Sequence, residues 1–142
     1  MIEDIQGFYD IVYKELKEFI TTNSKYKPYV FKEEPESKLF PLVVIKEPIR
    51  NGTYTTLKYT DKIYTFNTTI NIFAVKSGNI SGNSICEELS NIIERFFDEV
   101  YKMKININAG MINIDEDVSR TIITISCRVD TKFKDRLVIY PE

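Results

Sequence analysis

The sequence predicts an α+β fold, in which two long helices pack on one face of a mainly antiparallel sheet to form a two-layer domain. Two segments carry apolar residues at the three- and four-residue steps of an amphipathic helix, and several others alternate apolar and polar residues like half-buried strands. The predicted order is helix, three or four strands, helix, two strands and an apolar tail. Helices gathered on one face of an antiparallel sheet define this class. With 142 residues, the chain suits one domain covering residues 1–142.

Two amphipathic segments predict the helices. The first runs from Ile2 to Ile20 and is expected to end at Thr21–Ser24, whereas the second starts at Ser84, which has capping-box spacing to Glu87, and runs to about Lys102. Each segment has an apolar stripe that we expect to be buried. The two stripes comprise Ile2, Ile5, Tyr9, Val12, Leu16 and Phe19, then Ile85, Leu89, Ile92, Ile93, Phe96 and Val100.

The clearest strand is Tyr64–Lys76, which we place at the centre of the sheet because its alternation is regular. Before it, Tyr29–Lys32 is a short strand, Leu39–Lys46 is a β-branched one, and Asn51-Gly52 introduces a polar arm at Thr53–Tyr59. The closing strands are Ile105–Ile114, with a bulge or break at Gly110 where the apolar register changes phase, and Arg120–Asp130. Residues 131–142 form an apolar C-terminal extension.

Composition and charge argue against several function classes. The net charge is −2 and the cationic residues are scattered, so no basic stripe of the kind that binds DNA sequence-specifically is present. Passive contact with DNA inside a channel stays open. The N-terminus lacks the pattern of a signal peptide, and the longest apolar runs fall far short of the ~20 residues that cross a bilayer. We therefore expect no association with membranes.

The sequence holds few groups that could perform catalysis. There is no histidine, which removes the commonest general base and transition-metal ligand. Cys86 and Cys127 are expected to be buried, reduced thiols without an activating partner, and Asp115–Asp117 is expected to be a solvated turn rather than a cation site. We predict that the chain is not an enzyme and has no catalytic, cofactor-binding or metal-binding residues.

The charges are instead distributed as in an assembling subunit. Acidic residues gather on the second helix and at the Asp115–Asp117 turn, and basic residues gather near the C-terminus. Complementary patches at different places on one chain suit a head-to-tail, ring-forming contact. The alternatives are a monomer with ordinary surface loops and a C-terminal segment that folds back on its own domain as an edge strand. The predicted interface comprises Arg50, Tyr54, Lys58, Tyr59, Glu94, Asp115, Asp117, Arg128, Lys132, Lys134, Arg136 and Tyr140.

Several segments together resemble a known family. The strand LFPLVVIK, the long strand YTFNTTINIFAV, the helix SICEELSNIIERFF and the hairpin INAGMINI…RTIITISCRVD follow an amphipathic N-terminal helix. Over about residues 2–130 this pattern is similar to the tail terminator, or tail completion, family of long-tailed phages, especially those of low-GC Gram-positive bacteria.

The resemblance implies a hexameric ring in the neck or tail of a virion, assembled in the cytoplasm of the bacterial host. Such a ring sits on the last ring of the tail tube, stops tube polymerisation and offers a docking face to the head connector. In contractile tails and tail-like bacteriocins it also contacts the sheath. The family has no catalytic residues. The competing functions are a head–tail adaptor or tube subunit, and a regulatory or small-ligand binding module, which would need a lined cavity.

Overall fold

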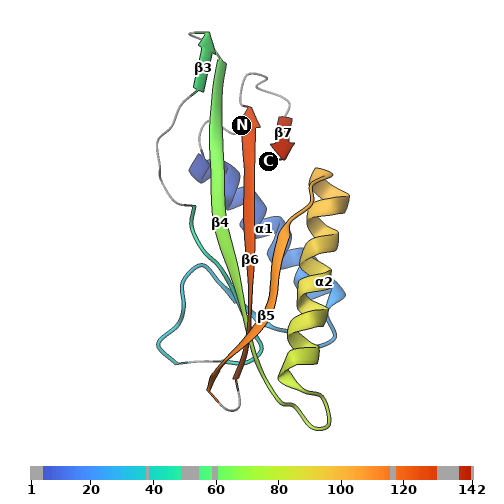
Figure 1. Cartoon of the computed structure of the whole chain (residues 1–142). Helices are drawn as coiled ribbons and strands as arrows, with labels where there is room; N and C mark the ends of the chain where they lie inside the picture. The colour runs from blue at the N-terminus through green and yellow to red at the C-terminus, as the bar shows by residue number, and fades with distance from the viewer. Residues whose placement is uncertain are drawn as a thin grey trace.

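The computed structural model describes the backbone of residues 5–37, 39–48, 55–58, 61–115, 118–130 and 138–141, and the side chains of 6–37, 39–48, 66–107 and 118–127. It has the α+β fold that the sequence predicts (Figure 1). Its elements are α1 (Ile5–Asn23), β1 (Tyr29–Phe31), β2 (Leu42–Ile45), β3 (Thr55–Lys58), β4 (Asp61–Val75), α2 (Gly82–Tyr101), β5 (Asn106–Asp115), β6 (Val118–Asp130) and β7 (Val138–Pro141).

Two long strands, β4 and β6, form the centre of the sheet. They pair antiparallel from Ile63 opposite Asp130 to Val75 opposite Val118. β2 and β3 share the outer edge of β4, and β5 and β7 share the outer edge of β6, so each central strand has two shorter partners at different heights. Only the β1–β2 pair is parallel among these pairings. The prediction of a mainly antiparallel sheet around residues 64–76 is confirmed.

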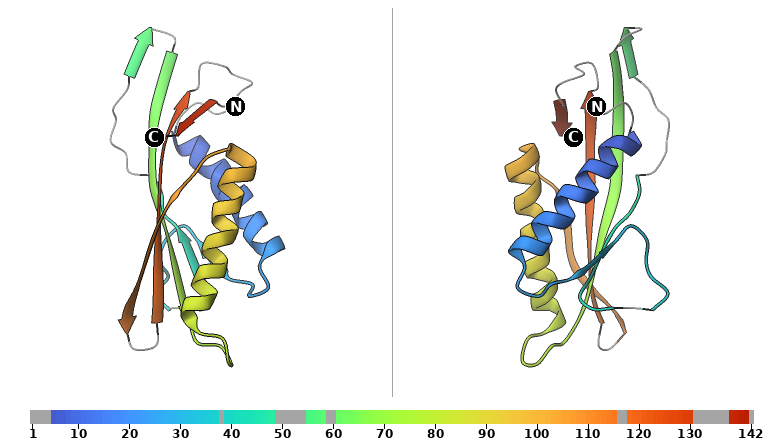
Figure 2. Two further views of the ribbon diagram at one scale, coloured as in Figure 1. Left: turned by 45° about the vertical axis from the view of Figure 1, so that its right-hand side comes forward. Right: turned by 180° about the vertical axis from the view of Figure 1, so that it is seen from behind.

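Both helices lie on the same face of this sheet (Figure 2). Because side chains alternate along a strand, one face of β4 carries Phe66, Ile70 and Ile72 into the core beneath the helices. On the opposite face, Phe73 packs with Leu42 and Val44 of β2 in a smaller buried cluster. Core burial therefore favours one face of the sheet, as the alternating sequence predicts.

The first helix runs three residues past Ile20 and ends within the predicted Thr21–Ser24 segment. It continues through Asn23 because polar side chains bond back to the last turn instead of ending it. Thr21 Oγ1 donates to the carbonyl of Lys17 at 2.8 Å, and Asn23 Nδ2 donates to the carbonyl of Phe19 at 2.8 Å. Its predicted stripe is buried at Tyr9, Val12 and Leu16 and partly buried at Phe19, whereas Ile2 and the side chain of Ile5 lie outside the described residues. Ile20, which the predicted stripe left out, is buried as well.

The second helix begins earlier than predicted. Its N-cap is Ser81, whose hydroxyl accepts a hydrogen bond from the backbone N–H of Ser84 at 3.1 Å, so Ser84 lies within the first turn. The helix ends at Tyr101, and its C-cap, Lys102, has a left-handed conformation with φ of 53°. The predicted stripe is buried except at Val100, which is 46% exposed. That prediction was wrong because Val100 lines a groove between α1 and α2, where the two helices do not close over it.

The strand boundaries differ from the prediction by a few residues. β2 is limited to Leu42–Ile45, β3 occupies part of the predicted arm, and β6 begins two residues before Arg120. The Asn51-Gly52 turn lies outside the described residues. The register of β5 shifts between Asn108 and Ile112, which confirms the irregularity predicted around Gly110.

The C-terminal extension is part of the sheet. Val138–Pro141 pairs antiparallel with Cys127–Asp130 of the same chain, and Tyr140 lies opposite Arg128. The structure therefore matches the alternative of an edge strand that folds back on its own domain. The prediction that residues 131–142 form an appended extension is therefore wrong for Val138–Pro141. These residues join the sheet because the upper edge of β6 offers unpaired backbone groups to them.

Candidate interaction surface

An arm formed by β3 and the first residues of β4 extends beyond the helices (Figures 1 and 2). The 15 residues of β4 span about 50 Å at about 3.3 Å per residue. The 20 residues of α2 span only about 30 Å at about 1.5 Å per residue. α2 is therefore too short to cover the whole of β4, and α1 also lies below the arm in Figure 1.

The predicted interface residues fall at different ends of the molecule. Arg128 and Tyr140 lie opposite each other near the upper end of β6, whereas Asp115 lies opposite Val118 at its lower end. The ten steps from Val118 to Arg128 correspond to about 33 Å of strand, at about 3.3 Å per step. Lys58 lies in the arm, opposite Asp61. Arg50, Tyr54, Tyr59, Asp117, Lys132, Lys134 and Arg136 lie outside the described residues.

The outer surface of α2 is acidic. Glu94, the predicted interface residue on this helix, is exposed, as are Glu87 and Asp98. Glu99 forms an ion pair with Arg95 at 3.7 Å, and Glu88 forms one with Lys25 at 3.9 Å. Arg95 is the only cationic residue between Gly82 and Tyr101, so this helix keeps an excess of negative charge.

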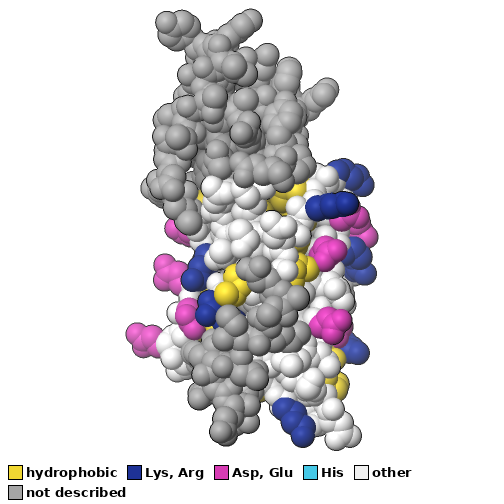
Figure 3. Space-filling view, viewed as in Figure 1, with side chains coloured by type: hydrophobic (Ala, Val, Ile, Leu, Met, Phe, Trp, Pro, Cys, Tyr) yellow, Lys and Arg dark blue, Asp and Glu magenta, His cyan; other side chains and the backbone are white. Residues whose placement is uncertain are grey.

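The helix-free face of the sheet carries polar pairs across β4 and β6. Ser126 Oγ donates to Asn67 Oδ1 at 2.6 Å. The Arg120 guanidinium donates from Nε and Nη2 to Asn71 Oδ1, at 3.1 and 2.7 Å, and lies 5.4 Å from the centroid of the Phe73 ring. In Figure 3 the described middle of this face is largely uncharged, with charged side chains toward its margins. The alternation of the sequence predicted that these side chains share one face. It did not predict the hydrogen bonds to Asn67 and Asn71, because those depend on which residues of β4 and β6 lie opposite each other.

The cysteines are placed for packing. Cys86 and Cys127 are free and buried, as predicted. Cys86 Sγ lies 3.6 Å from the carbonyl oxygen of Ser119, and burial raises the pKa of the thiol from 9.0 to about 11. A thiol with that pKa is protonated at neutral pH and is a poor nucleophile. Among the described residues there is no group of three or more potential metal ligands and no helix suited to crossing a membrane.

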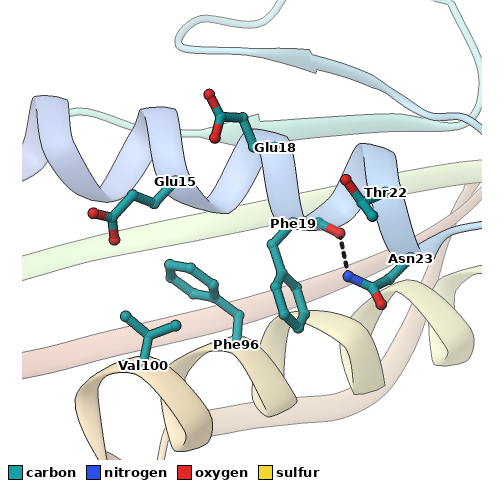
Figure 4. Close-up of a pocket in the computed structure, with 7 residues that line it drawn as sticks. All are labelled: Glu15, Glu18, Phe19, Thr22, Asn23, Phe96 and Val100. Atoms are coloured by element: carbon teal, nitrogen blue, oxygen red, sulfur yellow. Dashed lines mark hydrogen bonds between the residues drawn. The ribbon is translucent and has the colours of Figure 1, made fainter.

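Sequence reasoning missed a groove between α1 and α2. Its volume is about 360 Å³, and Glu15, Phe19, Phe96 and Val100 lie between the two helices, with Glu18 and Thr22 on the outer side of α1 (Figure 4). The phenyl rings of Phe19 and Phe96 pack with centroids 5.4 Å apart. The stripe periodicity could not reveal the groove, because it does not specify where two packed helices diverge.

The chain was compared with protein-family models, with curated proteins and with solved structures, and none of the three comparisons found a match. The resemblance to the tail terminator family stays a prediction.

Proposed function

We propose that this chain is a structural ring subunit that caps a phage-type tail tube, stops its polymerisation and provides the docking face for the head connector. In a contractile tail or a tail-like bacteriocin, the same ring ends the sheath. The subunit is a hexamer located in the tail or neck, assembled in the host cytoplasm, and DNA passes through the ring without specific contacts. Its role is structural rather than catalytic.

The observation that carries this proposal is the arm of β3 and β4. Beyond Ile63, where the pairing of β4 with β6 ends, the arm has only two strands among the described residues. A two-stranded ribbon is marginally stable in water unless another surface packs on it. The helices of the same chain end before the arm does (Figure 1). A neighbouring subunit supplies the missing packing surface, and subunit contacts through an arm are compatible with a closed ring.

The separation of charge supports a head-to-tail contact. Arg128 lies near one end of β6, and Asp115 lies at the other. With the acidic outer surface of α2, this arrangement presents different charges at different places on one subunit. Unlike patches that meet between copies produce heterologous interfaces, which close into rings when the rotation between copies permits it.

The test is electron microscopy and mass measurement of the purified chain, alone and mixed with its cognate tail tubes. We expect rings with sixfold symmetry, free or seated at one end of each tube, and tubes whose growth stops after the chain is added. A chain that stays monomeric with tubes present, and leaves tube growth unchanged, contradicts the proposal. Rings that bind the head connector but never the tube favour the head–tail adaptor instead.

A further inference from the structure

The outer side of α1 carries two exposed cations. Lys14 and Lys17 lie about one turn apart and form no ion pair among the described residues. Lys17 Nζ lies 5.9 Å from the centroid of the Tyr13 ring, so its contact within the chain is with an aromatic face rather than a carboxylate. Both positive charges are therefore accessible to carboxylates from outside the chain.

A hollow runs along the same side of α1. Its volume is about 610 Å³, and it is lined by Tyr13, Lys14, Lys17 and Thr21 together with one carboxylate, that of Glu18. From Tyr13 to Thr21 it follows eight helical steps, or about 12 Å at about 1.5 Å per step. We call this surface the cationic hollow. A convex acidic surface, such as the outer side of an acidic helix, matches its shape and its excess of positive charge.

The outer side of α2 carries carboxylates that match this description. Glu87, Glu94 and Asp98, the acidic stripe, are exposed, and unlike Glu88 and Glu99 they form no ion pair among the described residues. Their spacings of seven and four residues align them along one side of the helix. The stripe extends about 16 Å at about 1.5 Å per residue, so it is long enough to cover the hollow.

The two surfaces lie on opposite flanks of the helix layer. The helices meet at the rings of Phe19 and Phe96, whose centroids are 5.4 Å apart. An α-helix turns about 100° per residue, so a residue two positions away projects about 160° from that contact. Lys17 stands in this relation to Phe19, and Glu94 and Asp98 stand in it to Phe96. One subunit cannot bring its own two surfaces together, whereas two copies can.

We infer that the acidic stripe of one copy binds the cationic hollow of the next, so that copies join head to tail through their helix layers. Two unlike surfaces that meet in this way form a heterologous contact, which closes into a ring when the rotation between copies permits it. A second copy is favoured over any other acidic partner, because the chain itself supplies a stripe of matching length and opposite charge. The inference rests on the association of copies in the proposed function, but not on the capping of a tube.

Two double variants test the contact by charge reversal. Lys14→Glu with Lys17→Glu makes both surfaces acidic, and Glu94→Lys with Asp98→Lys makes both predominantly cationic. Each variant alone should associate about tenfold more weakly than the unmodified chain, because attraction becomes repulsion. An equimolar mixture should regain most of this loss, because each variant then meets a complementary surface on the other. Sedimentation equilibrium over a concentration series gives the association constants.

Matched controls make the same charge changes outside both surfaces. Lys27→Glu with Lys76→Glu, and Glu33→Lys with Glu36→Lys, reverse exposed residues and should change the association constant less than twofold. In about 1 M salt the difference between the test variants and the unmodified chain should shrink, because the Debye length falls to about 3 Å. Circular dichroism checks that each variant keeps its fold.

Several results would overturn the inference. Test variants that associate like the unmodified chain would exclude the helices from the contact and leave the ring proposal standing. Weakening that mixing does not relieve, or that the controls share, would mean that the two surfaces do not face each other. An unmodified chain that is monomeric at every concentration would contradict both the contact and the ring. Tubes that keep growing beside normally associated chains would contradict tube capping alone.

Discussion

Gly82 lies where the start of α2 meets the sheet. A Cβ at this position would lie 2.7 Å from the carbonyl oxygen of Ala74 and 3.0 Å from Ser119 Oγ. Gly82→Ala should therefore destabilise the chain by about 1–3 kcal/mol despite the better helix propensity of alanine, because a backbone oxygen cannot move aside cheaply. Urea unfolding followed by circular dichroism measures this, with Asn91→Ala on the exposed surface of α2 as control. Unchanged stability in Gly82→Ala would contradict the close packing.

The thiol of Cys86 should react slowly in the folded chain. Its pKa is raised to about 11 by burial, so the thiol is more often protonated in the folded chain than in the unfolded one between pH 9 and pH 11. This contribution to the free energy of unfolding is complete below about pH 9 and is lost as the pH rises toward 11.

A thiol-reactive dye at pH 8 should label Cys86 and Cys127 only after urea is added. Cys86→Ser should leave ring formation intact, and loss of rings at unchanged stability would reveal a chemical role that we have missed.

At the scale of elements, local sequence patterns were enough to predict those helices and strands whose structure is determined by the burial of one apolar face. The alternation of β4 and the stripes of α1 and α2 follow from one apolar face meeting one core, so the sequence predicts them well. β7 was missed because four residues carry too little periodicity, and their pairing depends on an edge of β6 that is distant in sequence. The parallel β1–β2 pair and the α1–α2 groove are nonlocal in the same sense.

β7 should contribute to the stability of its own domain. Removing residues 138–142 leaves the backbone of Cys127–Asp130 without a partner on that edge, so the melting temperature should fall by several degrees and aggregation should increase. Differential scanning calorimetry and light scattering provide the test. A truncated chain that melts normally but forms no rings would restore the assembly role.

Unlike β7, the arm should contribute to ring assembly more than to the stability of its own domain. Thr55→Pro removes a backbone donor from β3, which lies beyond the helix layer, so the melting temperature should change little while rings are lost. Val43→Pro in buried β2 is the control and should unfold the domain. Thermal melting and mass photometry separate the two effects. Rings that persist in a folded Thr55→Pro variant would exclude the arm from the interface.

At the scale of the whole molecule, ring assembly should depend on charge. Lys132→Glu with Lys134→Glu should block rings, and increasing salt should weaken rings of the unmodified chain, if these residues meet acids of a neighbour. The double reversal of exposed Lys27 and Lys76 makes the same change in net charge as a control. Analytical ultracentrifugation across a salt series gives the oligomer mass. Identical masses in all samples would leave the charge-based contact without support, and the alternative of a monomeric domain would be favoured.

The long pairing of β4 with β6 also determines when the chain can fold. The partners are far apart in sequence, from Val75 with Val118 to Ile63 with Asp130, and α2 and β5 lie between them. Loop closure over such separations slows folding relative to chains rich in local contacts. During synthesis, β4 leaves the ribosome before β6 does, and the backbone along its central edge stays unpaired for that interval. The nascent chain is most prone to aggregation in the interval between the emergence of β4 and that of β6. A chaperone that covers the unpaired edge of β4 would have its largest effect in this interval.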